Sequence, residues 1–240
     1  MGFRKATGLS LAALTVAAAW WLVTPHPGLE IVDQQSPPAR VMPPKVEVVN
    51  TTVEPHYVFG KTAAEIRKIT LADPSRLPSN ISRDQGATEE GMTSLTWPHG
   101  LHRTNISLDV GPPVNGIITG RYETVNVSAG YDQIDVYVAD YPANSCQYNV
   151  ILRHESTHVA NARNTLARAM PALRAAIQAA VDKGPVTGRT DDEVKAAGVA
   201  RIEAAAATVL DPVVKETVRL DAALDSLASY RALSKQCPHW

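Results

Sequence analysis

The sequence predicts an α+β fold in which a small antiparallel or mixed sheet precedes a bundle of long helices. Three observations support this prediction. Apolar and polar residues alternate in short runs between residues 106 and 139, as they do in half-buried strands. From residue 145 onward the chain is rich in alanine and other helix formers. Aromatic residues make up only 5% of the chain, which favours closely packed helices over a large β-sandwich.

The first residues have the pattern of an export signal. Arg4 and Lys5 precede an apolar core from residue 9 to residue 23, and a positive flank before an apolar run is typical of a Sec-type signal. Residues 1–24 are expected to be a signal peptide, cleaved at a run of alanines, or an uncleaved anchor that spans the membrane through residues 6–24. The protein is therefore expected to be exported and periplasmic, either anchored in the inner membrane or soluble after cleavage.

A proline-rich segment follows the signal. Residues 25–44 contain six prolines, a density that prevents helices and sheet ladders and predicts an extended linker. One folded domain is expected over residues 45–240, a length typical of a single domain with accessory segments. The formal net charge is -1, so there is no basic surplus and no nucleic-acid partner is expected.

The elements expected before residue 140 are mostly strands. A β-rich stretch begins near Val46 and ends near Val58. Thr62 and Glu65 then have the spacing of a capping box, which predicts a short helix. Residues 73–104 are rich in Pro, Ser, Asn and Gly and are expected to be irregular. Alternation then predicts separate strands at 106–110, 117–119, 122–127 and 134–139.

The remainder of the chain is expected to be helical. Asn144 or Ser145 can cap a helix that runs to about Ala169, after which Pro171 and Gly184 interrupt the pattern. The segment Thr190-Asp191-Asp192-Glu193 predicts the start of a second long helix, since acidic residues are stabilised near a helix N-terminus. Pro212 is expected to kink this helix or to begin a new one.

The most specific chemical signal is the segment His154-Glu155-Ser156-Thr157-His158. Two histidines four residues apart lie on one face of a helix and can hold a zinc ion with bonds of about 2.0–2.1 Å. Glu155 lies at the edge of that face, where its carboxylate can take a proton from zinc-bound water, whose pKa the metal lowers towards about 7. Asn161 lies near the same stripe and is either a surface residue or a contact to the site. The segment predicts Glu155 as the catalytic base and His154 and His158 as metal ligands.

A catalytic zinc needs a third protein ligand and an open position. The spacing HExxHxxGxxH is absent, because Asn164 stands where the third histidine would lie. Glu203, an acid among apolar residues and alanines, is the first candidate for the third ligand. Asp221 and Asp225 are alternatives, and the sequence leaves the choice open.

The two cysteines suggest one further candidate. Cys146 and Cys237 are expected to form a disulfide, because an export signal directs a protein to an oxidising compartment. That bond would close a loop of about 90 residues and tie the C-terminus to the beginning of the helix that carries the two histidines. His239 lies two residues beyond Cys237, a span of at most about 7 Å, so it is also a possible ligand.

These residues together resemble a bacterial family of predicted secreted zinc-dependent proteases, labelled domain of unknown function 922. The likeness covers roughly residues 56–230. Tyr57-Val58-Phe59-Gly60-Lys61-Thr62 with Glu65-Ile66 is similar to the opening strand and helix of that family. Residues 136–142 are similar to the strand before its active helix, and residues 154–160 to its zinc helix.

The chain departs from that family near its C-terminus. Members commonly carry a Tyr-Asp-x-x-Thr-x-His-Gly stretch, and here only Leu220-Asp221 and Leu224-Asp225 match its beginning. The resemblance implies a zinc-dependent peptidase of the cell envelope, with a peptide or protein substrate. The sheet edge near residues 134–139 is the expected binding place of an extended peptide. A cell-wall amide hydrolase and a non-catalytic envelope binding protein are the alternatives.

Overall fold

The computed structural model describes residues 42–72 and 94–238. The expected signal or anchor over residues 1–24 lies outside the described residues, as do most of the linker over 25–44 and His239. Within the described ranges, no helix combines the length and the apolar character needed to cross a bilayer.

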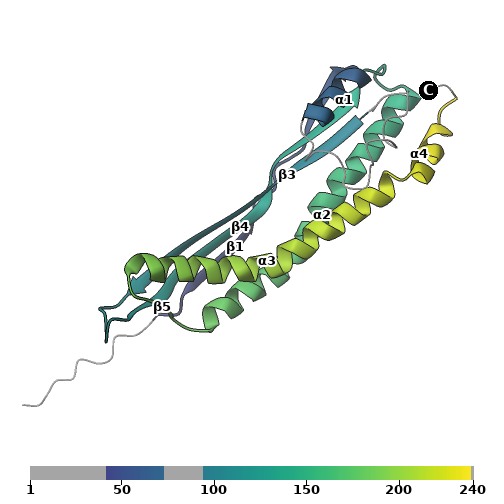
Figure 1. The fold of residues 1–240 in the computed structure, drawn as a ribbon. Helices are drawn as coiled ribbons and strands as arrows, with labels where there is room; N and C mark the ends of the chain where they lie inside the picture. The colour runs from purple at the N-terminus through teal and green to yellow at the C-terminus, as the bar shows by residue number, and fades with distance from the viewer. Residues whose placement is uncertain (1–41, 73–93, 239–240) are drawn as a thin grey trace, which may run out of the picture. The chain divides into compact units, whose positions relative to one another are not determined.

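The α+β class is confirmed, with a five-stranded sheet followed by helices (Figure 1). The β-rich stretch near Val46 to Val58 forms two strands, and the short helix follows where the capping box predicts it. The elements described, in chain order, are β1 Lys45–Asn50, β2 His56–Lys61, α1 Ala63–Ala72, β3 Ser94–Val110, β4 Ile118–Ala139, α2 Cys146–Asp182, β5 Val186–Gly188, α3 Asp191–Leu224 and α4 Leu227–Ser234.

Strand β4 is the centre of the sheet. Along one edge it pairs antiparallel with β3 over almost its whole length. Along its other edge it pairs in succession with β5, antiparallel, and with β1 and β2, both parallel. The sheet is therefore mixed, and the alternative of an antiparallel sheet is wrong because β1 and β2 run in the same direction as β4.

Two local expectations for the strands are also wrong. Residues 94–104, expected to be irregular, belong to β3, since their backbone pairs with β4 despite Pro98 and Gly100. The three strands expected between residues 117 and 139 form the single strand β4, of 22 residues. Glycines within it did not end the strand, because the neighbouring strands supply hydrogen-bond partners along both of its edges.

A bulge in β4 decides which residues face the helices. The register shifts between His99 and Gly100 of β3, and β4 carries one additional residue there, Asp132. Such an insertion exchanges the two faces of a strand. The apolar β4 residues that are at most 1% exposed accordingly have odd numbers before the bulge and even numbers after it: Val125, Val127, Ala129, Ile134, Val136 and Val138. Thr96 pairs with Val136 and so lies on the face towards the helices.

Helices α2 and α3 lie along one face of the sheet (Figure 1). Each contains a proline, Pro171 in α2 and Pro212 in α3, and both helices continue through it. Helix α2 therefore ends at Asp182 and not near Ala169. Leu173 and Ile177, just beyond Pro171, are fully buried in the core, and we attribute the continuation of the helix to this packing.

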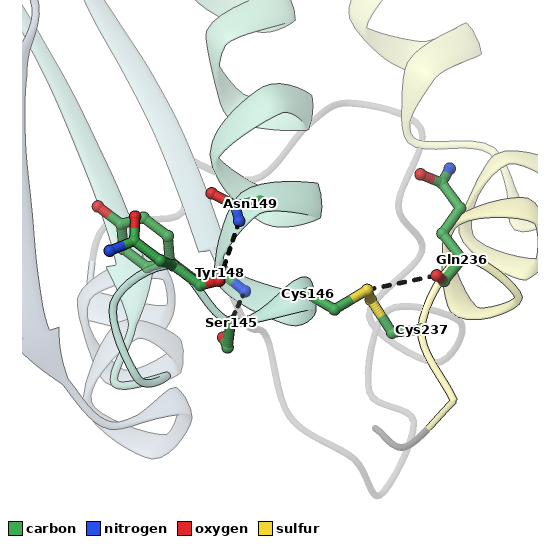
Figure 2. Close-up of a disulfide and its surroundings, with 7 residues drawn as sticks. Ser145, Cys146, Tyr148, Asn149, Gln236 and Cys237 are labelled. Atoms are coloured by element: carbon green, nitrogen blue, oxygen red, sulfur yellow. Dashed lines mark hydrogen bonds between the residues drawn. A yellow bond between two sulfur atoms is a disulfide. The ribbon is translucent and has the colours of Figure 1, made fainter.

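The helix caps expected from the sequence are present in the structure. The backbone N–H of Thr62 donates to Glu65 Oε2 at 2.7 Å, and the Glu65 N–H donates to Thr62 Oγ1 at 3.2 Å, which completes the capping box. Helix α2 is capped by Ser145, whose hydroxyl accepts from the Tyr148 N–H at 3.1 Å (Figure 2). Helix α3 is capped in the same way by Thr190.

The predicted disulfide between Cys146 and Cys237 is confirmed (Figure 2). It joins the first residue of α2 to the segment after α4, across 91 residues of sequence, with the two Cα atoms 5.7 Å apart. The end of the described chain is thereby fixed to the end of α2 that carries the histidines.

Candidate metal centre

The two histidines and the glutamate lie on α2 and are buried. The exposed fractions are 6% for His154, 2% for Glu155 and 8% for His158. Helix α2 turns these residues away from solvent, where Ile151 and Val159 of the same helix are also buried. Each of the three polar residues offers a ligand atom, and these atoms lie within 4.8 Å of one another, so the group could hold a metal ion.

Asp225, which follows α3 directly, brings a fourth side chain to this group. Its Oδ1 lies 3.2 Å from His154 Nε2 and 3.1 Å from His158 Nε2. The two Nε2 atoms are 3.3 Å apart. Two potential ligand atoms from α2 and one from the residue after α3 therefore form a nearly equilateral triangle.

The size of this triangle fits a zinc ion. Tetrahedral ligands with bonds of 2.0–2.1 Å lie about 3.3–3.4 Å apart, close to the three distances in the structure. Two imidazoles and one carboxylate are also a common protein donor set for catalytic zinc, which leaves a fourth position open. Lone pairs this close repel one another unless a cation or a proton lies between them, so the arrangement calls for positive charge.

His158 has the outer partner that metal-binding histidines usually have. Its Nδ1 lies 2.9 Å from Asp221 Oδ1, and a proton on Nδ1 donated to this carboxylate leaves Nε2 as the free ligand atom. The amide of Asn161 donates to the same Asp221 oxygen at 3.0 Å. Asn161 therefore contacts the site through Asp221, and Asp221 orients the ring of His158 through its Nδ1 atom.

Glu155 is held by the sheet. The hydroxyl of Thr96 on β3 donates to Glu155 Oε2 at 2.5 Å, and the other carboxylate oxygen lies 3.9 Å from His154 Nε2. Thr96 reaches this place because the bulge in β4 turns it towards α2. The carboxylate is thus fixed beside the triangle without being one of its corners, as a base that acts on a ligand of the metal would be.

Tyr230 of α4 also belongs to this cluster. Its hydroxyl donates to Asp225 Oδ1 at 3.0 Å, and its ring centroid lies 5.6 Å from that of His154. His154 Nδ1 is buried and has no hydrogen-bond partner among the described residues. Tyr230 and Thr96 were absent from the sequence hypothesis, since a lone tyrosine or threonine has no motif around it.

The charges in the cluster stabilise one another. Burial alone would lower the pKa of His158, but hydrogen bonds to Asp221 and Asp225 and the negative charges nearby outweigh it and raise the pKa to about 10. Burial alone would raise the pKa of Asp225, yet hydrogen bonds from both histidines and Tyr230 hold it well below its usual range. Burial and the charge of Asp225 raise the pKa of Tyr230 above its usual value. These contacts therefore favour the protonated, cationic form of His158 between carboxylates.

Glu203, the first candidate from sequence for the third ligand, does not reach the cluster. It lies exposed on α3, 18 residues before Asp221, which is about 27 Å along a helix. The spacing explains which acids do reach it. Asp221 and Asp225 are four residues apart, like the two histidines, and the antiparallel helices pair His158 with Asp221 and His154 with Asp225.

The expected peptide-binding edge at residues 134–139 is also wrong. This part of β4 is interior to the sheet, since Val136 pairs with Thr96 of β3 on one side and with Tyr57 of β2 on the other. Among the described strands, β3 pairs with β4 alone, as do β1, β2 and β5, so no described strand covers the outer edge of β3. Thr96, the contact of Glu155, lies on that strand.

No protein-family model matches the chain, and neither the curated proteins nor the solved structures include a significant match. The likeness to predicted secreted zinc-dependent proteases therefore remains a proposal, based on the residues quoted for it.

Proposed function

We propose that this protein is a zinc-dependent hydrolase of the cell envelope, and that its substrate is a peptide or protein. The observation that supports this most directly is the triangle of His154 Nε2, His158 Nε2 and Asp225 Oδ1, with edges of 3.1–3.3 Å. A general base beside three ligands and an open position is the arrangement that hydrolysis by a metal site requires.

The residues of the site would have the following roles in hydrolysis. His154, His158 and Asp225 would hold the ion, and Asp221 would keep His158 in the tautomer that leaves Nε2 free. A bound Zn²⁺ supplies Lewis acidity, which makes water a competent nucleophile near neutral pH. Glu155 would take the proton from the attacking water and pass it to the leaving amine. Thr96 fixes one carboxylate oxygen of Glu155, so the other remains available for this transfer.

The outer edge of β3, which no described strand covers, favours a peptide substrate. An unpaired strand edge presents backbone N–H and C=O groups that an extended peptide can pair with. Because Thr96 of this strand contacts Glu155, a peptide added to the edge of β3 would pass close to the base. The disulfide Cys146–Cys237 is compatible with the proposed export, since such bonds persist in oxidising compartments.

Zinc is expected to stabilise the fold. The purified protein should contain one zinc per chain, measured by elemental analysis, because the triangle provides one site. Binding at 100 times the dissociation constant should add about 2.7 kcal/mol to the free energy of unfolding. A chelator should therefore lower the melting temperature by several degrees. Absence of stoichiometric metal, with a melting temperature that a chelator leaves unchanged, would favour a non-catalytic binding protein.

Zinc affinity is expected to fall as the pH is lowered. In the ion-free protein the pKa of His158 is raised to about 10, so this side chain carries a proton throughout the neutral range. Zinc must displace that proton, and the dissociation constant should rise about tenfold for each unit of pH lowered. Calorimetry in buffers of different ionisation enthalpy should detect release of about one proton per zinc at pH 7. A pH-independent affinity would contradict the assigned ligand His158.

The substrate class is tested by turnover. Casein and a library of short peptides should be cleaved by the zinc-loaded protein, and the chelated protein should be inactive. Purified peptidoglycan serves as the competing substrate. Release of cell-wall fragments without proteolysis would replace the peptidase proposal with that of a cell-wall amide hydrolase.

A further inference from the structure

The two histidines of the candidate centre differ in how they are held. His158 is oriented by Asp221, at 2.9 Å from its Nδ1, whereas His154 Nδ1 has no partner among the described residues. An imidazole that binds a metal needs its ring fixed, and an outer hydrogen bond usually does this. The Nε2 atom contacts Asp225 and would bind the metal, so the other side of the His154 ring must be held by a contact other than a hydrogen bond.

Tyr230 is placed to do so. Its ring packs against the His154 ring at a centroid distance of 5.6 Å, and its hydroxyl donates to Asp225 Oδ1 at 3.0 Å. One side chain thus contacts both members of the His154–Asp225 pair. His154 is 6% exposed while Tyr230 is 44% exposed, so the tyrosine forms the outer part of this pair of rings.

The helix that carries Tyr230 is weakly packed. None of the described residues of α4 is buried. At its beginning it is joined to the centre through Ser226, which follows Asp225 directly and caps the helix. Beyond its end, Cys237 is bonded to Cys146 on α2 (Figure 2). A helix without a buried face is retained mainly by its ends and by specific contacts.

We propose that Tyr230 is a positioning residue that orients His154 and Asp225, and that the Cys146–Cys237 disulfide keeps it in place by fixing the far end of α4. This inference rests on the proposed metal site for its consequence, a dependence of zinc affinity on Tyr230 and on the oxidised state of the two cysteines. The contacts themselves are present in the structure.

The first test compares Tyr230→Phe with Tyr148→Phe, a tyrosine of α2 whose ring lies 5.8 Å from that of Phe59, outside the cluster. Tyr230→Phe should weaken Zn²⁺ binding about tenfold, the lower end of the range for an outer partner of a ligand, and should change the visible spectrum of the Co²⁺-loaded protein. Tyr148→Phe should alter neither. An unchanged zinc affinity and cobalt spectrum in Tyr230→Phe would reject the role of the hydroxyl in positioning Asp225. The same result in Tyr230→Leu, which also removes the aromatic ring, would reject the positioning of His154.

The second test concerns the disulfide. The double variant Cys146→Ser/Cys237→Ser, or wild type reduced under native conditions, should also lose about tenfold in zinc affinity. Adding Tyr230→Phe to this background should then have little further effect, because α4 no longer holds the tyrosine in place. Fully additive losses would show that Tyr230 acts without the disulfide and would overturn that half of the proposal.

Hydrogen exchange on the metal-free protein separates this inference from the proposed function. The amides of α4 should exchange faster in Tyr230→Phe and after reduction, and at the wild-type rate in Tyr148→Phe. If the protein binds no metal but exchanges in this pattern, the zinc function fails and the positioning role stands. If the amides of α4 exchange at the wild-type rate in Tyr230→Phe and after reduction, the positioning role fails whatever the metal content.

Discussion

Glu155→Gln should abolish hydrolysis while leaving zinc in place. Glutamine has the shape of glutamate and keeps an oxygen that can accept from Thr96, so the buried site should remain intact. It cannot take a proton, however, and loss of a general base lowers the turnover number by about 10²–10⁴-fold. Peptide turnover and zinc content, measured on the same preparation, check this.

A matched control for this variant is Glu216→Gln on α3. Glu216 is bound to Arg219 on the exposed surface, at 2.7 Å, and has no contact with the cluster. It should retain wild-type turnover and zinc content. Wild-type turnover in Glu155→Gln would remove Glu155 from the mechanism. Loss of zinc in that variant would instead make Glu155 a ligand.

Asp225→Asn should remove most of the zinc affinity. The substitution keeps the size of the side chain but takes away the charge of the oxygen that lies 3.1–3.2 Å from both Nε2 atoms. Loss of an outer partner costs about 10–100-fold in affinity, and loss of a charged direct ligand should exceed that range. Competition with a chromophoric chelator measures the dissociation constant.

Substitutions of two further carboxylate residues provide a comparison for this loss of zinc affinity. Asp221→Asn removes only the outer partner of His158 and should cost about 10–100-fold. Glu203→Gln, on the exposed part of α3, should leave the affinity unchanged. The expected order of loss is therefore Asp225→Asn first, Asp221→Asn second and Glu203→Gln last. A larger loss in Asp221→Asn than in Asp225→Asn would reverse the assigned roles of these two carboxylates.

Local features were predictable where neighbouring residues decide them. The capping box at Thr62 and the helix start at Thr190 each depend on residues close in sequence, and in both the threonine hydroxyl accepts from the N–H three residues on. The lengths of β4 and α2 were not predictable in this way. Glycine and proline weaken a strand or a helix locally, and packing of the whole element against the sheet outweighed that cost at Pro171.

By itself, the sequence determined that His154 and His158 share one face of a helix with Glu155 beside them, because a spacing of four residues has this consequence in any α-helix. Only the tertiary structure decided which acid meets them. Asp225 lies 71 residues from His154, and sliding α3 by one turn, about 5.4 Å, would exchange it for Asp221. That register is set by the packing of two long helices on the sheet, and no local pattern encodes it.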